Sequence, residues 1–126
     1  MVQRVFAAVV MLVVLTTGAL GLARAAAPSV AASPNVTSEP GWVDLRIRIE
    51  PDEANRELIV ELDSENFFRS SSIALAGDES PTMHWLRFDR LPAGKYVVRA
   101  SVERSGGGRL TGVSQFLVAG RTEGGI

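Results

Sequence analysis

The sequence predicts an all-β domain, an antiparallel β-sandwich of about six or seven strands that follows an N-terminal signal helix. Three observations support this prediction. An apolar leader opens the 126-residue chain, apolar and polar residues alternate with period two from Trp42 onward, and Gly, Pro and Asp turns separate short strands. Short strands at roughly ten-residue spacing are typical of sandwiches. No window of helical period follows the leader.

Residues 1–25 have the layout of a secretory signal peptide. Arg4 supplies the positive start, the 18 residues from Val5 to Leu22 are mostly apolar, and small residues follow. We expect cleavage after Ala25 or Ala27 and a periplasmic or secreted location. The alternative is a retained anchor, because about 18 apolar residues just reach the length that spans a bilayer. The leader would then be the chain's only contact with a membrane.

The next segment, residues 26–41, is rich in small and polar residues and contains three prolines. Such a composition predicts a flexible linker, since it buries too little apolar surface to become ordered. Asn35-Val36-Thr37 fits a glycosylation sequon, which matters only in a eukaryotic secretory route. Residues 42–119 are expected to form the sandwich, and residues 120–126 a disordered tail.

Alternation predicts where the strands lie, since successive side chains of a strand point to opposite faces. The expected strands are 43–50, 58–63, a short one at 73–75, 82–88, 96–103 and 109–118. Residues 66–72 are expected to be irregular, and Gly106-Gly107-Gly108 to form a permissive hairpin loop.

One stretch carries a resemblance to a known fold. Leu91-Pro92-Ala93-Gly94-Lys95-Tyr96, entered from Phe88, resembles the turn and following strand of fibronectin-III-like and other immunoglobulin-like domains. The resemblance implies a tyrosine corner, in which the Tyr96 hydroxyl returns to the backbone upstream. The cysteine position of antibody domains is Val98 here, and Trp85 does not match their core tryptophan. The string is also similar, more weakly, to carboxypeptidase-regulatory-like (transthyretin-like) domains, whose Thr-Asp-x-x-Gly lead-in is missing.

Composition narrows the classes of function. The leader holds two of the 13 basic residues and none of the 14 acidic ones, so removing it leaves 11 against 14, a net charge of −3. This balance argues against a nucleic-acid partner, which requires a concentrated basic face. The chain has no cysteine, which excludes disulfides, thiol catalysis and thiolate metal sites.

No constellation of catalytic or metal-ligating residues stands out, and the sequence predicts no cofactor. His84 is the single histidine and lacks companion ligands at metal-site spacing. Ser70-Ser71-Ser72 has no base or strained turn beside it. The carboxylates near Asp52 and Asp63 are expected at opposite ends of one hairpin. Solvated turn residues are the preferred interpretation, with calcium binding as the alternative.

Aromatic residues give the sharpest hypothesis for binding. The candidate binding residues are Phe67, Phe68, Arg69, Trp42 and Trp85. Phe67 and Phe68 cannot both point inward on an extended segment. An exposed ring beside Arg69 would stack on a sugar or anchor a protein. The alternative is that these rings cap the core. Arginines of the strands, Arg46 and Arg99 among them, are expected to form cross-strand ion pairs.

These observations lead to one expectation about function. The chain is expected to be an exported, non-catalytic module for protein interaction or structural support in the periplasm or cell envelope, with a protein partner. A carbohydrate-binding module that uses the exposed aromatics is the main alternative, and an enzyme or enzyme inhibitor is a third. The fold alone does not choose between them, since sandwiches serve binding, spacing and scaffolding alike.

Overall fold

The computed structural model describes residues 26–121, which form eight strands and one short 3₁₀ helix. In chain order these are β1 (Ser29–Ser33), β2 (Val36–Ser38), β3 (Gly41–Arg48), β4 (Asn55–Ser64), β5 (Phe67–Ala74), η1 (Gly77–Glu79), β6 (Met83–Leu91), β7 (Gly94–Arg104) and β8 (Arg109–Ala119). The expected leader, residues 1–25, and residues 122–126 of the expected tail lie outside the described residues. Within the described part, no helix is long and apolar enough to cross a membrane.

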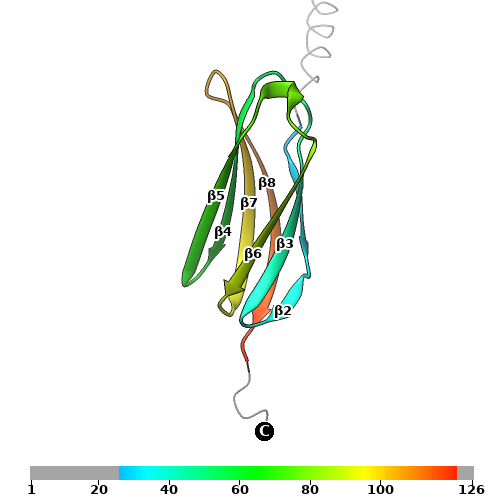
Figure 1. The fold of residues 1–126 in the computed structure, drawn as a ribbon. Helices are drawn as coiled ribbons and strands as arrows, with labels where there is room; N and C mark the ends of the chain where they lie inside the picture. The colour runs from blue at the N-terminus through cyan, green and yellow to red at the C-terminus, as the bar shows by residue number, and fades with distance from the viewer. Residues whose placement is uncertain (1–25, 122–126) are drawn as a thin grey trace, which may run out of the picture.

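The strands form two sheets that pack face to face (Figure 1). The three-stranded sheet has the order β1-β3-β6, and the five-stranded sheet has the order β2-β8-β7-β4-β5. Neighbouring strands are antiparallel, except that β2 runs parallel to β8. The predicted fold class, an all-β antiparallel sandwich, is therefore confirmed, with one more strand than the upper expected number.

The core lies between the sheets and is built from every second residue of the long strands. Because side chains alternate along a strand, one apolar face per strand suffices to fill it. The buried apolar residues are Val43, Leu45, Ile47, Ile49, Leu58, Val60, Leu62, Leu75, Phe88, Leu91, Tyr96, Val98, Ala100, Val102, Phe116 and Val118. The alternation in β3, β4 and β7 is the one that the sequence predicts.

The segment 26–41 is not a linker in this structure, which corrects the expected domain boundary. Ser29–Ser33 pairs with β3, and Val36–Ser38 pairs with β8, so the folded domain begins at Ser29. The chain crosses from one sheet to the other at Pro34. Composition does not predict these strands, because they are short, consist mostly of small residues and are stabilised by pairing with β3 and β8.

Residues 26–41 pack closely against β8, and glycines at two positions make this close packing possible. A Cβ on Gly112 of β8 would lie 1.9 Å from the carbonyl oxygen of Pro28, so only glycine permits this contact. A Cβ on Gly41 would lie 2.9 Å from side-chain atoms of Thr37 and Val118. The first residues of the domain thus close one side of the sandwich against β8.

A second correction concerns residues 66–72, which the sequence predicts to be irregular. Phe67–Ala74 forms strand β5, which pairs with β4 without a break in register. Serines contribute little strand propensity, so the local sequence does not predict this strand. The neighbouring β4 supplies the hydrogen bonds that hold it.

Candidate functional site

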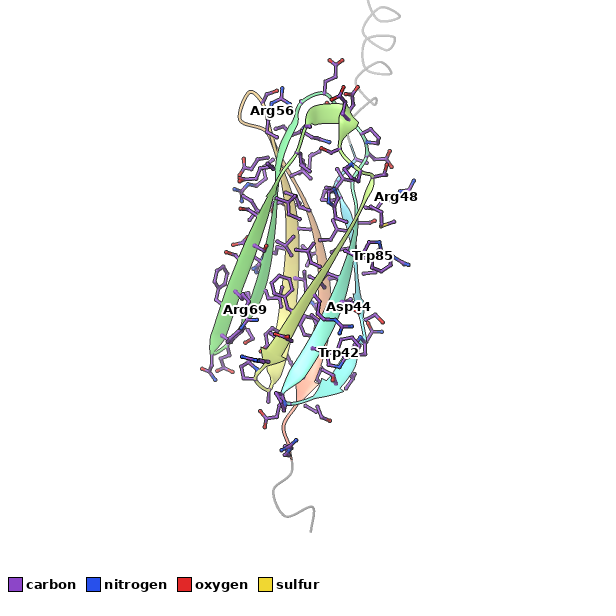
Figure 2. The ribbon with its side chains drawn as sticks, viewed as in Figure 1. Trp42, Asp44, Arg48, Arg56, Arg69 and Trp85 are labelled. Carbon is purple, nitrogen blue, oxygen red and sulfur yellow. The ribbon has the colours of Figure 1, made fainter. Side chains whose placement is uncertain are left out.

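The outward face of the three-stranded sheet carries two exposed tryptophans. Trp42 begins β3 and is 41% exposed, and Trp85 lies on β6 and is 67% exposed. Both point away from the core on the same side of the molecule (Figure 2). Exposed apolar side chains that gather on one surface, unlike scattered ones, are typical of interaction sites.

Arginines accompany both indole rings. The Arg87 guanidinium carbon lies 4.5 Å from the Trp42 ring centroid, and that of Arg46 lies 5.8 Å from the Trp85 ring centroid. Both distances fall within the range of cation–π attraction. Arg46 and Trp85 are register partners across β3 and β6, so the backbone pairing itself brings them together.

Asp44 forms a bidentate ion pair with Arg87 on the same surface. Arg87 donates from Nε to Oδ1 at 2.6 Å and from Nη2 to Oδ2 at 2.9 Å. This geometry holds the guanidinium plane in place beside Trp42. The hydrogen bond from Arg87 keeps the pKa of the Asp44 carboxyl below its ordinary value. We call the six residues that share this surface the tryptophan–arginine face: Trp42, Asp44, Arg46, Arg48, Trp85 and Arg87.

Positive charge on this face exceeds negative charge. Asp44 neutralises Arg87, whereas neither Arg46 nor Arg48 forms an ion pair within residues 26–121. Arg48 and Trp85 lie along the same side of the sheet as Asp44 (Figure 2). The face therefore combines two aromatic anchors with two free cations on a chain whose formal net charge is −1.

The other three candidate residues, Phe67, Phe68 and Arg69, lie on β5 in the five-stranded sheet and not on this face. Phe67 packs edge-on against Tyr96, with ring centroids 6.1 Å apart. Arg69 stacks over the Phe67 ring at 5.1 Å and donates from Nη1 to the Asp89 carbonyl oxygen at 3.0 Å. Phe68 points outward and is 56% exposed. The five candidates thus separate into two groups.

Tyr96 lies in the core at the start of β7. Its hydroxyl donates to the Pro92 carbonyl oxygen at 2.6 Å, the hydrogen bond that the resemblance implies. Its ring stacks on Phe116 with centroids 4.8 Å apart, and burial raises the pKa of its hydroxyl. Tyr96 therefore stabilises the turn between β6 and β7, and its buried side chain is not available for binding.

The expected cross-strand ion pair forms for Arg99 but not for Arg46, which has no ion pair within residues 26–121. Arg99 pairs with Asp63 at 3.3 Å, Arg104 with Asp52 at 2.7 Å, and Arg109 with Glu103. Asp52 also accepts the Ala54 N–H at 2.8 Å, so both of its oxygens are engaged in closing a turn.

His84 points inward on β6, opposite Ile47, and its Nε2 is buried without a hydrogen-bond partner among the described residues. No group of three or more His, Asp or Glu side chains suited to a metal ion occurs within residues 26–121.

At the expected hairpin loop, Gly106 and Gly107 take positive φ values of 86° and 90°. Only glycine adopts such angles without strain.

Sequence reasoning missed four members of the site: Asp44, Arg46, Arg48 and Arg87. The period-two rule places Asp44 on the same face as Trp42, and Arg87 on the same face as Trp85. What the sequence does not provide is the register that sets Asp44 opposite Arg87.

The strand order of the two sheets and the tyrosine corner define an immunoglobulin-like β-sandwich, as the resemblance implies. No family model matches the chain, and no curated protein matches it.

Similar solved structures include the superoxide reductase (neelaredoxin) from Ignicoccus hospitalis, with 12% identity and a TM-score of 0.56, covering 75% of this chain and 80% of that one. A variant of that protein gives 12% identity and a TM-score of 0.59, with 82% and 86% covered. The fn3 domain of the human collagen alpha-1(XX) chain is more distant in structure, with 17% identity, a TM-score of 0.47, and 82% and 89% covered. These likenesses concern the fold alone.

Proposed function

We propose that this chain is an exported, non-catalytic binding module that docks a protein partner on the tryptophan–arginine face. The observation that carries the proposal is the pair of exposed indoles, each accompanied by a guanidinium, on the outer surface of a hydrogen-bonded sheet. Tryptophan and arginine are among the residue types most enriched at the centres of protein interfaces.

Rigidity of the face favours binding. The backbone of β3 and β6 is fixed by pairing, and the Asp44–Arg87 ion pair fixes one guanidinium beside Trp42. A surface that is already ordered loses little conformational entropy when a partner docks. The two unpaired cations, Arg46 and Arg48, favour a partner surface with acidic side chains.

Export rests on the leader pattern of residues 1–25. Cleavage after Ala25 or Ala27 would leave β1 complete, since this strand begins at Ser29. Mass spectrometry of protein from the native host is expected to find a mature start at Ala26 or Pro28. An intact N-terminus in the membrane fraction would instead support the retained anchor.

Partner capture tests the binding face. Immobilised wild-type domain and a Trp42→Ser/Trp85→Ser variant are each incubated with the extracytoplasmic fraction of the host. Burying an indole contributes roughly 1.5–3 kcal/mol, so the double variant is expected to lose the proteins that the wild type retains. Val36→Ser/Val113→Ser is the matched control, because both valines are exposed and lie on the other sheet. Equal retention by all three proteins would refute the proposed face.

A carbohydrate-binding module that uses the same indoles remains the alternative. Sugar rings stack on the flat face of an aromatic side chain, and each indole here already has a guanidinium over its ring. That occupancy favours a protein partner over a sugar. A glycan array separates the two, since the protein-binding proposal predicts no signal from either the wild type or the double variant.

A further inference from the structure

Two sheets have four edge strands, and three of them carry features that prevent pairing with another chain. β2 is three residues long, with Pro34 and Pro40 close to its ends. β1 lies against β8, where the Pro28 carbonyl contacts Gly112. β6 carries Arg87 and the other charged residues Asp89 and Arg90, the last with φ of 55°. Proline, short length, charge and backbone distortion are the usual protections of a sheet edge.

The fourth edge, β5, lacks these protections. Eight consecutive residues pair with β4 without a bulge, and the strand contains no proline. Its single charged residue, Arg69, points inward, and its guanidinium is bound to the Asp89 carbonyl and stacked on Phe67. The charge is therefore directed across the sandwich and not along the free edge. Phe68 adds an exposed ring to this edge.

The register identifies which backbone groups of β5 remain free. Leu75 N–H donates to the Arg56 carbonyl at 2.9 Å, which makes this a hydrogen-bonded pair. Such pairs alternate along an antiparallel ladder, so Ile73, Ser71, Arg69 and Phe67 also face β4. The residues whose N–H and C=O groups point to the free edge are Phe68, Ser70, Ser72 and Ala74.

We propose that β5 pairs antiparallel with β5 of a second copy of this chain, centred on Ser71. In this register Phe68 faces Ala74 of the second copy, a large apolar side chain beside a small one. Ser70 faces Ser72 of that copy, which allows the two hydroxyls to hydrogen-bond. All four free residues of each edge are then paired. The result is one continuous ten-stranded sheet formed from two five-stranded sheets.

Charge disfavours one of the alternative registers. A ladder centred on Arg69 would place the two Arg69 residues opposite each other, and like charges in that position are destabilising. A ladder centred on Ser71 places Arg69 opposite Ile73 instead. The strand is thus complementary to itself in size, and the ladder centred on Ser71 brings no like charges together. This surface is separate from the tryptophan–arginine face, so the dimer does not depend on the proposed function.

Sedimentation velocity over a wide concentration range tests the dimer. The wild-type domain is expected to form dimers as concentration rises, and Ser70→Lys/Ser72→Lys is expected to stay monomeric, because the lysines oppose each other across the axis. Ser70 lies opposite Glu61 of its own chain, so the change is compatible with folding. Ser29→Lys/Ser33→Lys on β1 is the matched control and should still dimerise. A wild-type domain that is monomeric at millimolar concentration would overturn the proposal.

Disulfide cross-linking tests the register. Because the chain has no natural cysteine, an introduced cysteine is the only thiol that can form a disulfide. Ser71→Cys would lie on the two-fold axis in a non-hydrogen-bonded pair, where Cα atoms are about 4.5 Å apart and a disulfide can form. Mild oxidation is expected to give a covalent dimer faster than with Ser33→Cys. Equal cross-linking rates would refute the pairing centred on Ser71, even if a dimer exists.

Discussion

Arg69 on β5 and Asp89 on β6 connect the two sheets on the side opposite to β1 and β2. Arg69 Nη1 donates to the Asp89 carbonyl oxygen at 3.0 Å, while the rest of the guanidinium lies over the Phe67 ring. The two edge strands belong to different sheets and share no backbone ladder. This single side chain therefore supplies a polar link where strand pairing supplies none.

Replacing Arg69 is expected to lower stability. Arg69→Ala removes a charge-assisted hydrogen bond and a cation–π contact, and we expect the free energy of unfolding to fall by about 1–2 kcal/mol. Urea unfolding measures this change. Arg48→Ala is the control, because Arg48 is exposed and forms no ion pair among residues 26–121. Equal stability of the two variants would show that the link contributes nothing.

Tyr96 is expected to contribute to stability through its hydroxyl. Tyr96→Phe leaves the Pro92 carbonyl without its 2.6 Å donor while the stack on Phe116 is kept. We expect a loss of roughly 1–3 kcal/mol, because an acceptor that loses its partner inside the protein retains its desolvation cost. Chemical denaturation provides the measurement. Partner binding should not change, and an unaltered midpoint would argue against a stabilising corner.

Gly112 is expected to be intolerant of any side chain. In Gly112→Ala the new Cβ would meet the Pro28 carbonyl oxygen at 1.9 Å, so β1 must move away from β8. Overpacking of this kind costs typically about 1–3 kcal/mol, which thermal unfolding would detect. Gly108→Ala is the matched control on the adjacent hairpin, where the nearest atoms lie 3.9 Å and 4.0 Å away. Similar melting temperatures for both variants would mean that residues 26–28 do not hold this contact in solution.

The sequence predicts the long central strands but not β1, β2 and most of β5, which lie at or near the edges of the two sheets. β3, β4 and β7 alternate between aliphatic and polar residues, so the core pattern can be recognised before any pairing is known. β1, β2 and most of β5 consist of small or polar residues. Their strand conformation depends on hydrogen bonds to the strands beside them, and the local pattern of apolar residues does not reveal this pairing.

The candidate site was predictable to a similar extent. Exposed aromatics can be suspected from the sequence, and alternation within β3 correctly separates Trp42 from Val43. The pattern around Trp85 is mixed, so its outward direction depends on the pairing with β3. Only the register brings Arg46 beside Trp85 and Arg87 beside Asp44. Nor does the sequence show that Trp42 and Trp85 belong to one sheet while Phe67, Phe68 and Arg69 belong to the other.

Acid is expected to weaken the fold through three carboxyl groups. Hydrogen bonds keep the pKa values of Glu39, Asp44 and Asp52 below their ordinary values; the main donors are the Arg121 N–H, the Arg87 guanidinium and the Ala54 N–H, respectively. A carboxyl whose folded pKa is lowered stabilises the fold above its unfolded pKa, here 4.5 for Glu and 3.8 for Asp. This contribution is lost as pH falls through the folded pKa.

The melting temperature should therefore fall as pH decreases below about 5. Asp52→Asn removes one of the three groups, so its melting temperature should be lower at neutral pH and should change less with acid. Differential scanning calorimetry at a series of pH values measures both effects. A variant with the full acid sensitivity of the wild type would show that the contacts of Asp52 do not contribute to the pH dependence.

Phe67 and Phe68 are adjacent, yet their replacement is expected to have opposite consequences. Phe67 packs against Tyr96 and lies under Arg69, so Phe67→Ser removes two contacts from the edge of the core. We expect a loss of about 2–4 kcal/mol in the free energy of unfolding. Phe68 points outward, and Phe68→Ser should leave the monomer's melting temperature unchanged while weakening association through β5. Thermal unfolding and sedimentation measured on both variants separate the two roles. Equal destabilisation would mean that both rings close the end of the sandwich and that neither is free to contact a second chain.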